Sequence, residues 1–153
     1  PGGPAIQKIS EGGDPDKVNL PRPTTSNKFD YSFSGLKTAA VYFLQGLTDD
    51  DKLLKKDFAA SYQEAIVDSL MNIYEKAVTE TGVTNLSGGG GVMANTRLRE
   101  KIQTFAEKND KNLYLPSPKL STDNAAMICV AAKNNLTTNE MNIEDIRLSS
   151  VIS

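Results

Sequence analysis

Two short segments of the 153-residue chain combine residue types that could do chemistry. The first is the glycine run at residues 88–91, which follows a short apolar stretch and precedes a region of helical periodicity. Glycines let the backbone approach a ligand closely, and the N-terminus of a helix favours an anion. The run therefore indicates a phosphate-binding turn, and the amide of Asn95 in the next helical turn could reach a ribose or a phosphate.

The same run has a second interpretation that involves no ligand. It does not end in the Gly-Lys-Ser/Thr of a Walker A motif, and its spacing is not that of a dinucleotide fingerprint. A glycine-rich turn can also serve to pack against a neighbouring helix, and Asn95 can serve as a helix cap. From the local sequence alone, both interpretations stay open.

The second segment is STDN at residues 121–124, which precedes an apolar helix predicted to run to about Ala132. The carboxylate of Asp123 is a hard oxygen ligand suited to a metal ion, although Thr122 or Asp123 could instead cap the helix. One carboxylate cannot make a metal site, and the chain contains no histidine. Any further ligands must therefore come from outside this chain or from a bound ligand.

Composition restricts the class of protein without identifying it. Apolar residues make up 39% and charged residues 24%, and the net charge is −2, which is ordinary for a soluble globular domain. That charge gives no global attraction to nucleic acid or to an anionic membrane, and no apolar run approaches a membrane span. The lone Cys129 is predicted to be a buried core residue and fits a reducing compartment.

Basic residues form two groups on predicted helices, where they either form solvated faces or contact an RNA backbone. They are Lys52, Lys55 and Lys56 in one group and Arg97, Arg99 and Lys101 in the other.

The elements that position these residues follow an α/β order. Helices are predicted over residues 5–10, 35–45, 49–81, 93–108 and 123–132, with a weaker one at 140–147, and strands over 83–86 and 113–115. Ser34 is predicted to cap the second helix and Gly82 to end the third. Two strands are too few for a complete parallel sheet. Together with a start at PGGP without methionine, this predicts that the chain is part of a longer protein.

Six segments, in order, resemble motifs of the TsaD-type family of tRNA threonylcarbamoyladenosine synthesis. They are PGGPA (1–5), FSGLKTA (33–39), SYQEA (61–65), GGVMANTRLR (90–99), LYLP (113–116) and TDNAAMI (122–128). The resemblance implies an actin/Hsp70/sugar-kinase-like (ASKHA) fold. Residues 1–133 would belong to its second lobe, with a mainly helical insertion at 22–81, and residues 134–153 would form a tail to which nothing is carried over.

The resemblance also implies a function. Such a protein would transfer a threonylcarbamoyl group from threonylcarbamoyl-AMP to an adenosine next to the tRNA anticodon, in the cytoplasm and with other subunits. By position, Gly3, Asn95, Gly90 and Gly91 correspond to adenylate- or substrate-binding residues. Asp123 corresponds to a ligand of the active-site metal, which is iron or alternatively zinc. Such a metal can polarise a carbonyl, and backbone N–H groups can hold the adenylate phosphate.

The chain also departs from the family pattern. It lacks counterparts of the family's HxxxH metal ligands, of an upstream glycine-rich substrate loop and of an aspartate before PGGP. We therefore expect the isolated chain to be inactive and to bind metal weakly. Two alternatives are a non-enzymatic scaffold or dimerisation paralogue and a related O-carbamoyltransferase. Asp123 and Asn95 argue against the scaffold, and the segments at 33–39 and 90–99 favour the tRNA enzyme.

Overall fold

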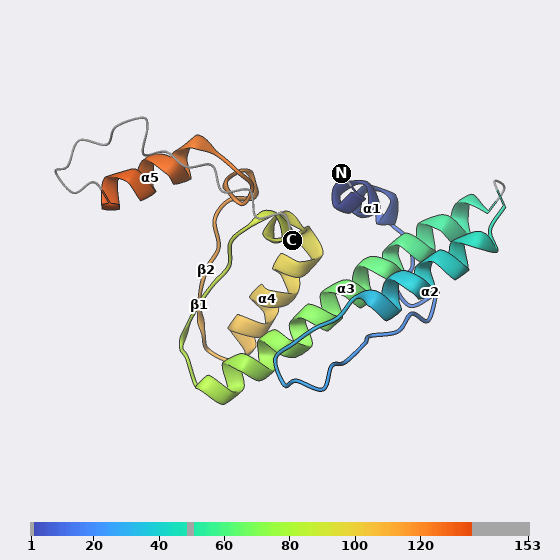
Figure 1. Cartoon of the computed structure of the whole chain (residues 1–153), viewed down its shortest axis with the longest axis horizontal. Coiled ribbons are helices and arrows are strands. Elements are labelled where there is room, and N and C mark those ends of the chain that lie inside the picture. The colour runs from blue at the N-terminus through green and yellow to red at the C-terminus, as the bar shows by residue number, and fades with distance from the viewer. Residues whose placement is uncertain (1, 49–50, 136–153) are drawn as a thin grey trace. The chain divides into compact units, whose positions relative to one another are not determined.

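The computed structural model describes residues 2–48 and 51–135, and the chain divides between Thr122 and Asp123 into two compact units. The predicted helix at 140–147 lies outside the described residues. The elements of the first unit are α1 (Gly2–Ser10), α2 (Ser34–Gln45), α3 (Lys52–Thr81), β1 (Asn85–Ser87), the 3-10 helix η1 (Gly91–Ala94), α4 (Thr96–Lys108), β2 (Asn112–Tyr114) and the 3-10 helix η2 (Pro118–Leu120) (Figure 1). The second unit contains α5 (Ala125–Asn135).

The long helix α3 is the element against which the rest of the first unit packs. In Figure 1, α2 lies along its N-terminal half and α4 lies beside its C-terminal half. The helical spacing of apolar residues predicts a single buried stripe on this helix, made of Phe58, Tyr62, Ala65, Ile66, Leu70, Ile73 and Ala77. Because α3 has neighbours on more than one side, its buried residues do not form that single stripe. Met71 and Val78 are buried, whereas the predicted Ile73 and Ala77 are only half-buried.

Three hydrophobic clusters follow one another along α3. The first joins α2 and the preceding loop to α3, with the rings of Phe43 and Phe58 stacked at 4.7 Å between centroids. The second joins α3 to η1 and α4, and the third joins α3 to β1 and α4. The buried members of these two clusters are Val67, Met71, Met93, Leu98 and Ile102 in the second, and Val78, Leu86 and Ala106 in the third. These two clusters hold the glycine run in place.

The two strands form a small parallel sheet, with α4 as the connection between them. Leu86 lies opposite Leu113 in the register. Both strands occur where the sequence predicts them, displaced by one or two residues. This mixture of helices with a two-stranded parallel sheet is compatible with part of an α/β domain.

The residues at the ends of α2 and α3 can be compared with the predicted caps. Gly82 ends α3 as predicted, with a φ of 66° and its N–H donating to the carbonyl of Val78. The prediction for Ser34 is wrong: Ser34 lies inside α2, and Phe33 occupies the cap position without a side-chain bond. Helix α1 begins at Gly2 rather than at residue 5, because Pro4 is tolerated in a first turn, where backbone N–H groups lack helical partners anyway.

The prediction that Cys129 is buried is also wrong. Cys129 is exposed, as are its neighbours Ile128 and Val130 on α5. The physical reason is that the second unit has no other described helix or strand to cover this apolar stretch. None of the described helices is both long enough and apolar enough to span a membrane.

A glycine just after α1 lies against the backbone of α3. A Cβ atom on Gly13 would lie 2.6 Å from the carbonyl oxygen of Lys56 and 3.1 Å from the Cβ of Ala60. We expect Gly13→Ala to lower the free energy of unfolding by about 1–3 kcal/mol, measured by urea denaturation. Gly46→Ala is the control, because its Cβ would meet only ordinary contact at 3.5 Å. Equal stability of both variants would contradict this close approach.

Candidate nucleotide-binding turn

The four glycines after β1 have different surroundings. A Cβ on Gly88 would lie 2.8 Å from the terminal methyl of Met93 and 3.0 Å from a methyl of Leu115, so this glycine packs against the ends of these two side chains. At Gly89, Gly90 and Gly91, no atom of the described residues, apart from chain neighbours, lies within 4 Å of such a Cβ. The two interpretations left open by the sequence therefore divide along the run: its first residue packs, and the next three leave their backbone open.

Gly90 also requires glycine for its backbone conformation. Its φ of 86° and ψ of 168° lie in a region that essentially only glycine occupies. The run then enters the 3-10 helix η1, and α4 begins only at Thr96. The helix predicted over 93–108 is therefore present and ends at Lys108, but it starts later than predicted, at Thr96. Gly90 precedes and Gly91 begins the short 3-10 helix η1 rather than α4, so the macrodipole of α4 does not act at these two residues.

Asn95 is the N-cap of α4. Its side-chain oxygen accepts a hydrogen bond of 2.9 Å from the backbone N–H of Leu98, which is the cap interpretation. Its amide nitrogen donates to Oε1 of Gln63 at 2.9 Å. These bonds use one of the two N–H donors of the amide and one of its two main lone pairs. Capping therefore leaves Asn95 with hydrogen-bonding capacity for a ligand.

Helix α1, which carries Gly3, is tied to the segment that follows the glycine run. Oε1 of Gln7 accepts from the backbone N–H of Thr96 at 3.3 Å, and Nε2 of Gln63 donates to the hydroxyl of Ser10 at 3.2 Å. In the part of the chain that the structure describes, no atom outside the surrounding turn of α1 lies within 4 Å of a Cβ built on Gly3. The structure thus joins the helix of Gly3 to the segment of Asn95. Sequence reasoning did not single out Gln63 as a functional residue.

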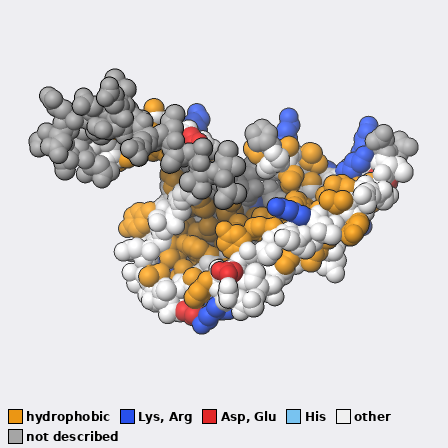
Figure 2. All heavy atoms as spheres, in the orientation of Figure 1, with side chains coloured by type: hydrophobic (Ala, Val, Ile, Leu, Met, Phe, Trp, Pro, Cys, Tyr) orange, Lys and Arg blue, Asp and Glu red, His pale blue; other side chains and the backbone are white. Residues whose placement is uncertain are grey.

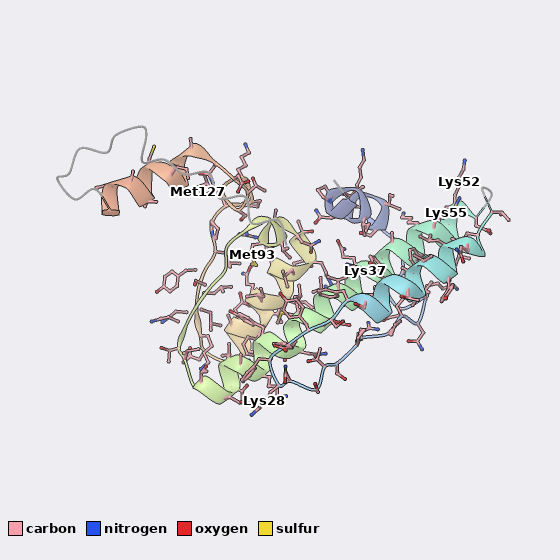
Figure 3. The ribbon with its side chains drawn as sticks, in the orientation of Figure 1. Lys28, Lys37, Lys52, Lys55, Met93 and Met127 are labelled. Carbon is pink, nitrogen blue, oxygen red and sulfur yellow. The ribbon has the colours of Figure 1, made fainter. Side chains whose placement is uncertain are left out.

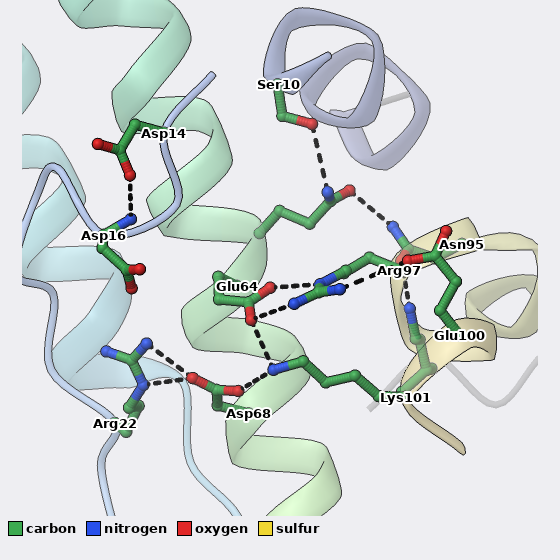
Figure 4. Close-up of polar contacts among 12 residues, drawn as sticks. Ser10, Asp14, Asp16, Arg22, Glu64, Asp68, Asn95, Arg97, Glu100 and Lys101 are labelled. Carbon is green, nitrogen blue, oxygen red and sulfur yellow. Dashed lines mark hydrogen bonds and ion pairs between the residues drawn. The ribbon is translucent and has the colours of Figure 1, made fainter. Parts of the chain in front are cut away.

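A line of charged side chains docks α4 on α3 (Figure 4). The guanidinium of Arg97 donates to both carboxylate oxygens of Glu64 at 2.8 Å, and Nζ of Lys101 lies 2.6 Å from the same carboxylate. Lys101 also pairs with Asp68, which Arg22 contacts from the loop before α2 at 2.7 Å. The network therefore connects three separate parts of the first unit.

This network changes the interpretation of the second basic group. Arg97 and Lys101 are paired with acidic residues of α3, and Arg99 donates to the backbone carbonyls of Met93 and Pro116. They are internal anchors of α4 and the turn rather than a solvated face. In the first group, Lys52 is exposed at the N-terminal end of α3 (Figure 3). Contact of this group with RNA stays a prediction.

Exposed apolar side chains border the glycine run. Val92, within η1, is 62% exposed, and Tyr114, opposite Ser87 in the sheet, is 63% exposed. In Figure 2, hydrophobic side chains gather over the part of the first unit where the sheet and α4 lie. A surface that combines open backbone with apolar side chains suits a ligand with a phosphate and a flat ring.

Asp123 is exposed and belongs to the second unit. The side chain that bonds to the start of α5 is that of Asn124, whose Oδ1 accepts from the N–H of Met127 at 3.0 Å. The interpretation of Asp123 as the cap is therefore wrong by one position. Among the described residues, no three His, Cys, Asp or Glu side chains gather as a metal-binding group. Residues 2–48 and 51–135 thus do not make a complete metal site.

Comparison with known proteins confirms the resemblance. Residues 1–130 match the family described as TsaD, tRNA N6-adenosine threonylcarbamoyltransferase. A protein of that name from Thermosipho africanus is 45% identical over 132 residues, which cover 86% of this chain and 40% of that protein. Its namesake from Fervidobacterium nodosum is 41% identical over 145 residues, which cover 92% of this chain and 42% of the relative. The chain therefore belongs to the TsaD family, and it spans about two-fifths of the length of these relatives.

The carboxylate of Glu64 makes the docking of α4 sensitive to pH. Hydrogen bonds from Arg97 and then from Lys101 outweigh burial and hold the pKa of Glu64 at about 2, against a usual 4.5. The lowered pKa means that this stabilisation is fully present above pH 4.5 and is lost as the pH falls toward 2. Acid unfolding followed by circular dichroism should therefore show a loss of stability in this window.

The variant Glu64→Gln should lower the free energy of unfolding at pH 7 by about 1–3 kcal/mol, because two cations would lose their shared anion. The stability of this variant should also depend less on pH between 4.5 and 2. Glu100→Gln is the matched control, since Glu100 is 64% exposed and lies 3.5 Å from Arg97, whereas the side chain of Glu64 is 11% exposed. If the two variants lost the same stability, the Glu64 carboxylate would not be what docks α4.

Proposed function

We propose that this chain forms part of the nucleotide-binding region of an enzyme that transfers a threonylcarbamoyl group from threonylcarbamoyl-AMP to an adenosine next to the anticodon of tRNA. The observation that carries the proposal is the open backbone of Gly90 and Gly91, which follow β1 and begin the family motif at 90–99. The reaction class is supported by membership of the TsaD family, whose relatives are named tRNA N6-adenosine threonylcarbamoyltransferases.

The chemistry of this transfer explains why an open backbone turn would be useful. The N6 nitrogen of the adenosine forms a bond to the carbonyl carbon of the threonylcarbamoyl group. The bond from that carbon to the phosphate oxygen breaks, its electron pair leaves with AMP, and N6 gives up one proton to solvent. Negative charge thus develops on the AMP phosphate. Backbone N–H groups at Gly90 and Gly91 would stabilise that charge, and they need no rearrangement to do so.

The remaining residues of the region would hold the rest of the nucleotide. The unused N–H of Asn95 is suited to a ribose hydroxyl or a phosphate oxygen. Gly3 would let the ligand approach the first turn of α1, because none of the described residues occupies the place of its side chain. The exposed side chains of Val92 and Tyr114 offer apolar surface for the adenine ring.

For the fold, we propose that residues 1–133 belong to the second lobe of an actin/Hsp70/sugar-kinase-like fold, with residues 22–81 as a mainly helical insertion. In support, α2 and α3 occupy most of that span and share a hydrophobic cluster of their own. The parallel strands β1 and β2 follow the insertion, with α4 between them. Two strands of three residues are few for an α/β sheet, so the complete domain would add strands from elsewhere in the protein.

Asp123 would contribute one carboxylate oxygen to a metal ion, which the family resemblance suggests is iron or alternatively zinc. The described residues supply no complete ligand set, so the other ligands would come from outside them. We infer that the active protein acts on tRNA in the cytoplasm together with other subunits of the threonylcarbamoyl transfer complex. The isolated chain would be inactive.

The ligand-contacting role of the turn can be separated from folding by a matched pair of glycine variants. Neither Gly91 nor Gly89 has a positive φ, and within residues 2–48 and 51–135 no atom beyond their chain neighbours lies within 4 Å of a built Cβ, so alanine fits this part of the chain at both. In the intact protein, we expect Gly91→Ala to weaken AMP binding about tenfold, measured by calorimetric titration, because the methyl group would take space needed by the phosphate. Gly89→Ala should stay within about twofold of the parent. Unchanged binding by Gly91→Ala would remove Gly91 from the site.

The role of Asp123 can be separated from the start of α5. In the intact protein, Asp123→Ala should lose bound metal, measured by elemental mass spectrometry after gel filtration, and should lose threonylcarbamoyladenosine formation on tRNA. Asn124→Ala is the control, because it removes the bond to the N–H of Met127 and keeps the carboxylate. Full metal content in Asp123→Ala would exclude the ligand role. Equal losses in both variants would assign the effect to the helix start.

A further inference from the structure

We propose that Gln63 is a positioning residue that fixes the orientation of the Asn95 amide and ties α1 to the segment after the glycine run. This inference rests on the proposed function, because it takes Asn95 as a residue that contacts the nucleotide. Gln63 lies half-buried near the middle of α3. The residue belongs to the SYQEA segment, for which the proposed function assigns no task.

The contacts of Gln63 form part of a hydrogen-bond chain that runs in one direction. The N–H of Leu98 donates to Asn95, the amide of Asn95 donates to Gln63, and the amide of Gln63 donates to Ser10. The hydroxyl of Ser10 then donates to the backbone carbonyl of Gln7 at 2.8 Å. Each group accepts from one neighbour and donates to the next. The chain therefore crosses from α4 through α3 to α1 without a break.

This arrangement determines which way round the Asn95 amide lies. Rotating that amide by half a turn would place its NH2 group against the N–H of Leu98 and its oxygen against Oε1 of Gln63. Both hydrogen bonds would be lost, and two repulsive contacts would replace them. The orientation of Asn95 is thus set jointly by the N–H of Leu98 and by the acceptor at position 63. That orientation decides whether a donor or an acceptor of Asn95 remains for a ligand.

The residue at position 63 must accept a hydrogen bond from Asn95 and donate one to Ser10, and only an amide of this length does both. Glutamate could still accept from Asn95 but could not donate to Ser10, whose own proton is given to Gln7. Leucine has similar bulk but can neither accept nor donate. Asparagine is shorter by one methylene group and would not span the same gap. The side chain of Gln63 therefore bridges Asn95 and Ser10, with its oxygen accepting from Asn95 and its nitrogen donating to Ser10.

Loss of Gln63 should leave the packing of α3 intact. The neighbouring Glu64 still binds Arg97 and Lys101, and Ser61 still accepts from the backbone N–H of Val18 at 3.1 Å. Because these anchors do not involve Gln63, a change at this position should act locally. Its effect should be seen in the geometry of Asn95 rather than in global stability.

The test uses the intact protein and AMP as the probe. We expect Gln63→Leu to weaken AMP binding about tenfold in a calorimetric titration, which corresponds to the loss of one correctly placed hydrogen bond. Gln63→Glu keeps the acceptor for Asn95 and should recover most of the affinity. The double variant Gln63→Leu with Asn95→Ala should bind AMP no more weakly than Asn95→Ala alone. Independent, multiplying losses in the double variant would overturn the proposal, because Gln63 would then not act through Asn95.

Hydrogen exchange without nucleotide separates this inference from the proposed function. The amide N–H of Leu98 should exchange faster in Gln63→Leu than in the parent, and Gln63→Glu should restore its protection. If exchange at Leu98 changes as expected while Asn95→Ala leaves AMP binding unaltered, Gln63 orients Asn95 and the nucleotide role of Asn95 is wrong. If exchange at Leu98 is the same in all variants, the positioning role itself is overturned.

Discussion

The region around the glycine run depends on one buried carboxylate. Glu64 accepts two hydrogen bonds from Arg97 and lies 2.6 Å from Lys101, and these two cations are on the face of α4 that meets α3. Without that carboxylate, Arg97 would keep only the exposed Glu100 and Lys101 only Asp68, and the two cations would lose the anion that they share. Because α4 follows the glycine run and leads into β2, its docking sets the position of both. Gln63 lies next to Glu64 on α3, so the ion pairs and the hydrogen-bond chain contact α4 from the same turn of that helix.

Much of the secondary structure could be predicted from the sequence, for local reasons. Helix α4 has a periodic apolar face, α3 is long, and Gly82 has the ordinary signature of a helix end. The packing of α3 could not be predicted in the same way. A hydrophobic pattern indicates one buried face, whereas α3 has neighbours on more than one side, so Met71 and Val78 are buried outside the expected stripe. Gln63 gave no local signal at all, since its partners are 53 and 32 residues away.

In the candidate site too, some features could be predicted from the local sequence, whereas others depend on residues that are distant in the chain. The sequence correctly indicated that the glycine run matters, but four identical residues cannot be ranked by composition. The structure separates them by what surrounds each: side chains at Gly88, a demanding backbone angle at Gly90 and open space at Gly89 and Gly91. The cap of α5 was misplaced by one residue because Asp, Asn and Thr are similarly suited to that position. Asn95 is a cap and still retains capacity for a ligand, so those two interpretations were not exclusive.

The one-way hydrogen-bond chain has a consequence for how this protein can change over evolutionary time. Every donor in the chain points toward α1, so replacing one member removes or inverts the polarity that its neighbour needs. The amino acids at positions 10, 63 and 95 therefore constrain one another during evolution, because their side chains share one hydrogen-bond chain. A substitution at one of them would be retained mainly when a second restores the match. Among relatives of this chain, amino acids at these three positions should vary together, whereas exposed positions on α2 such as Val41 should vary alone.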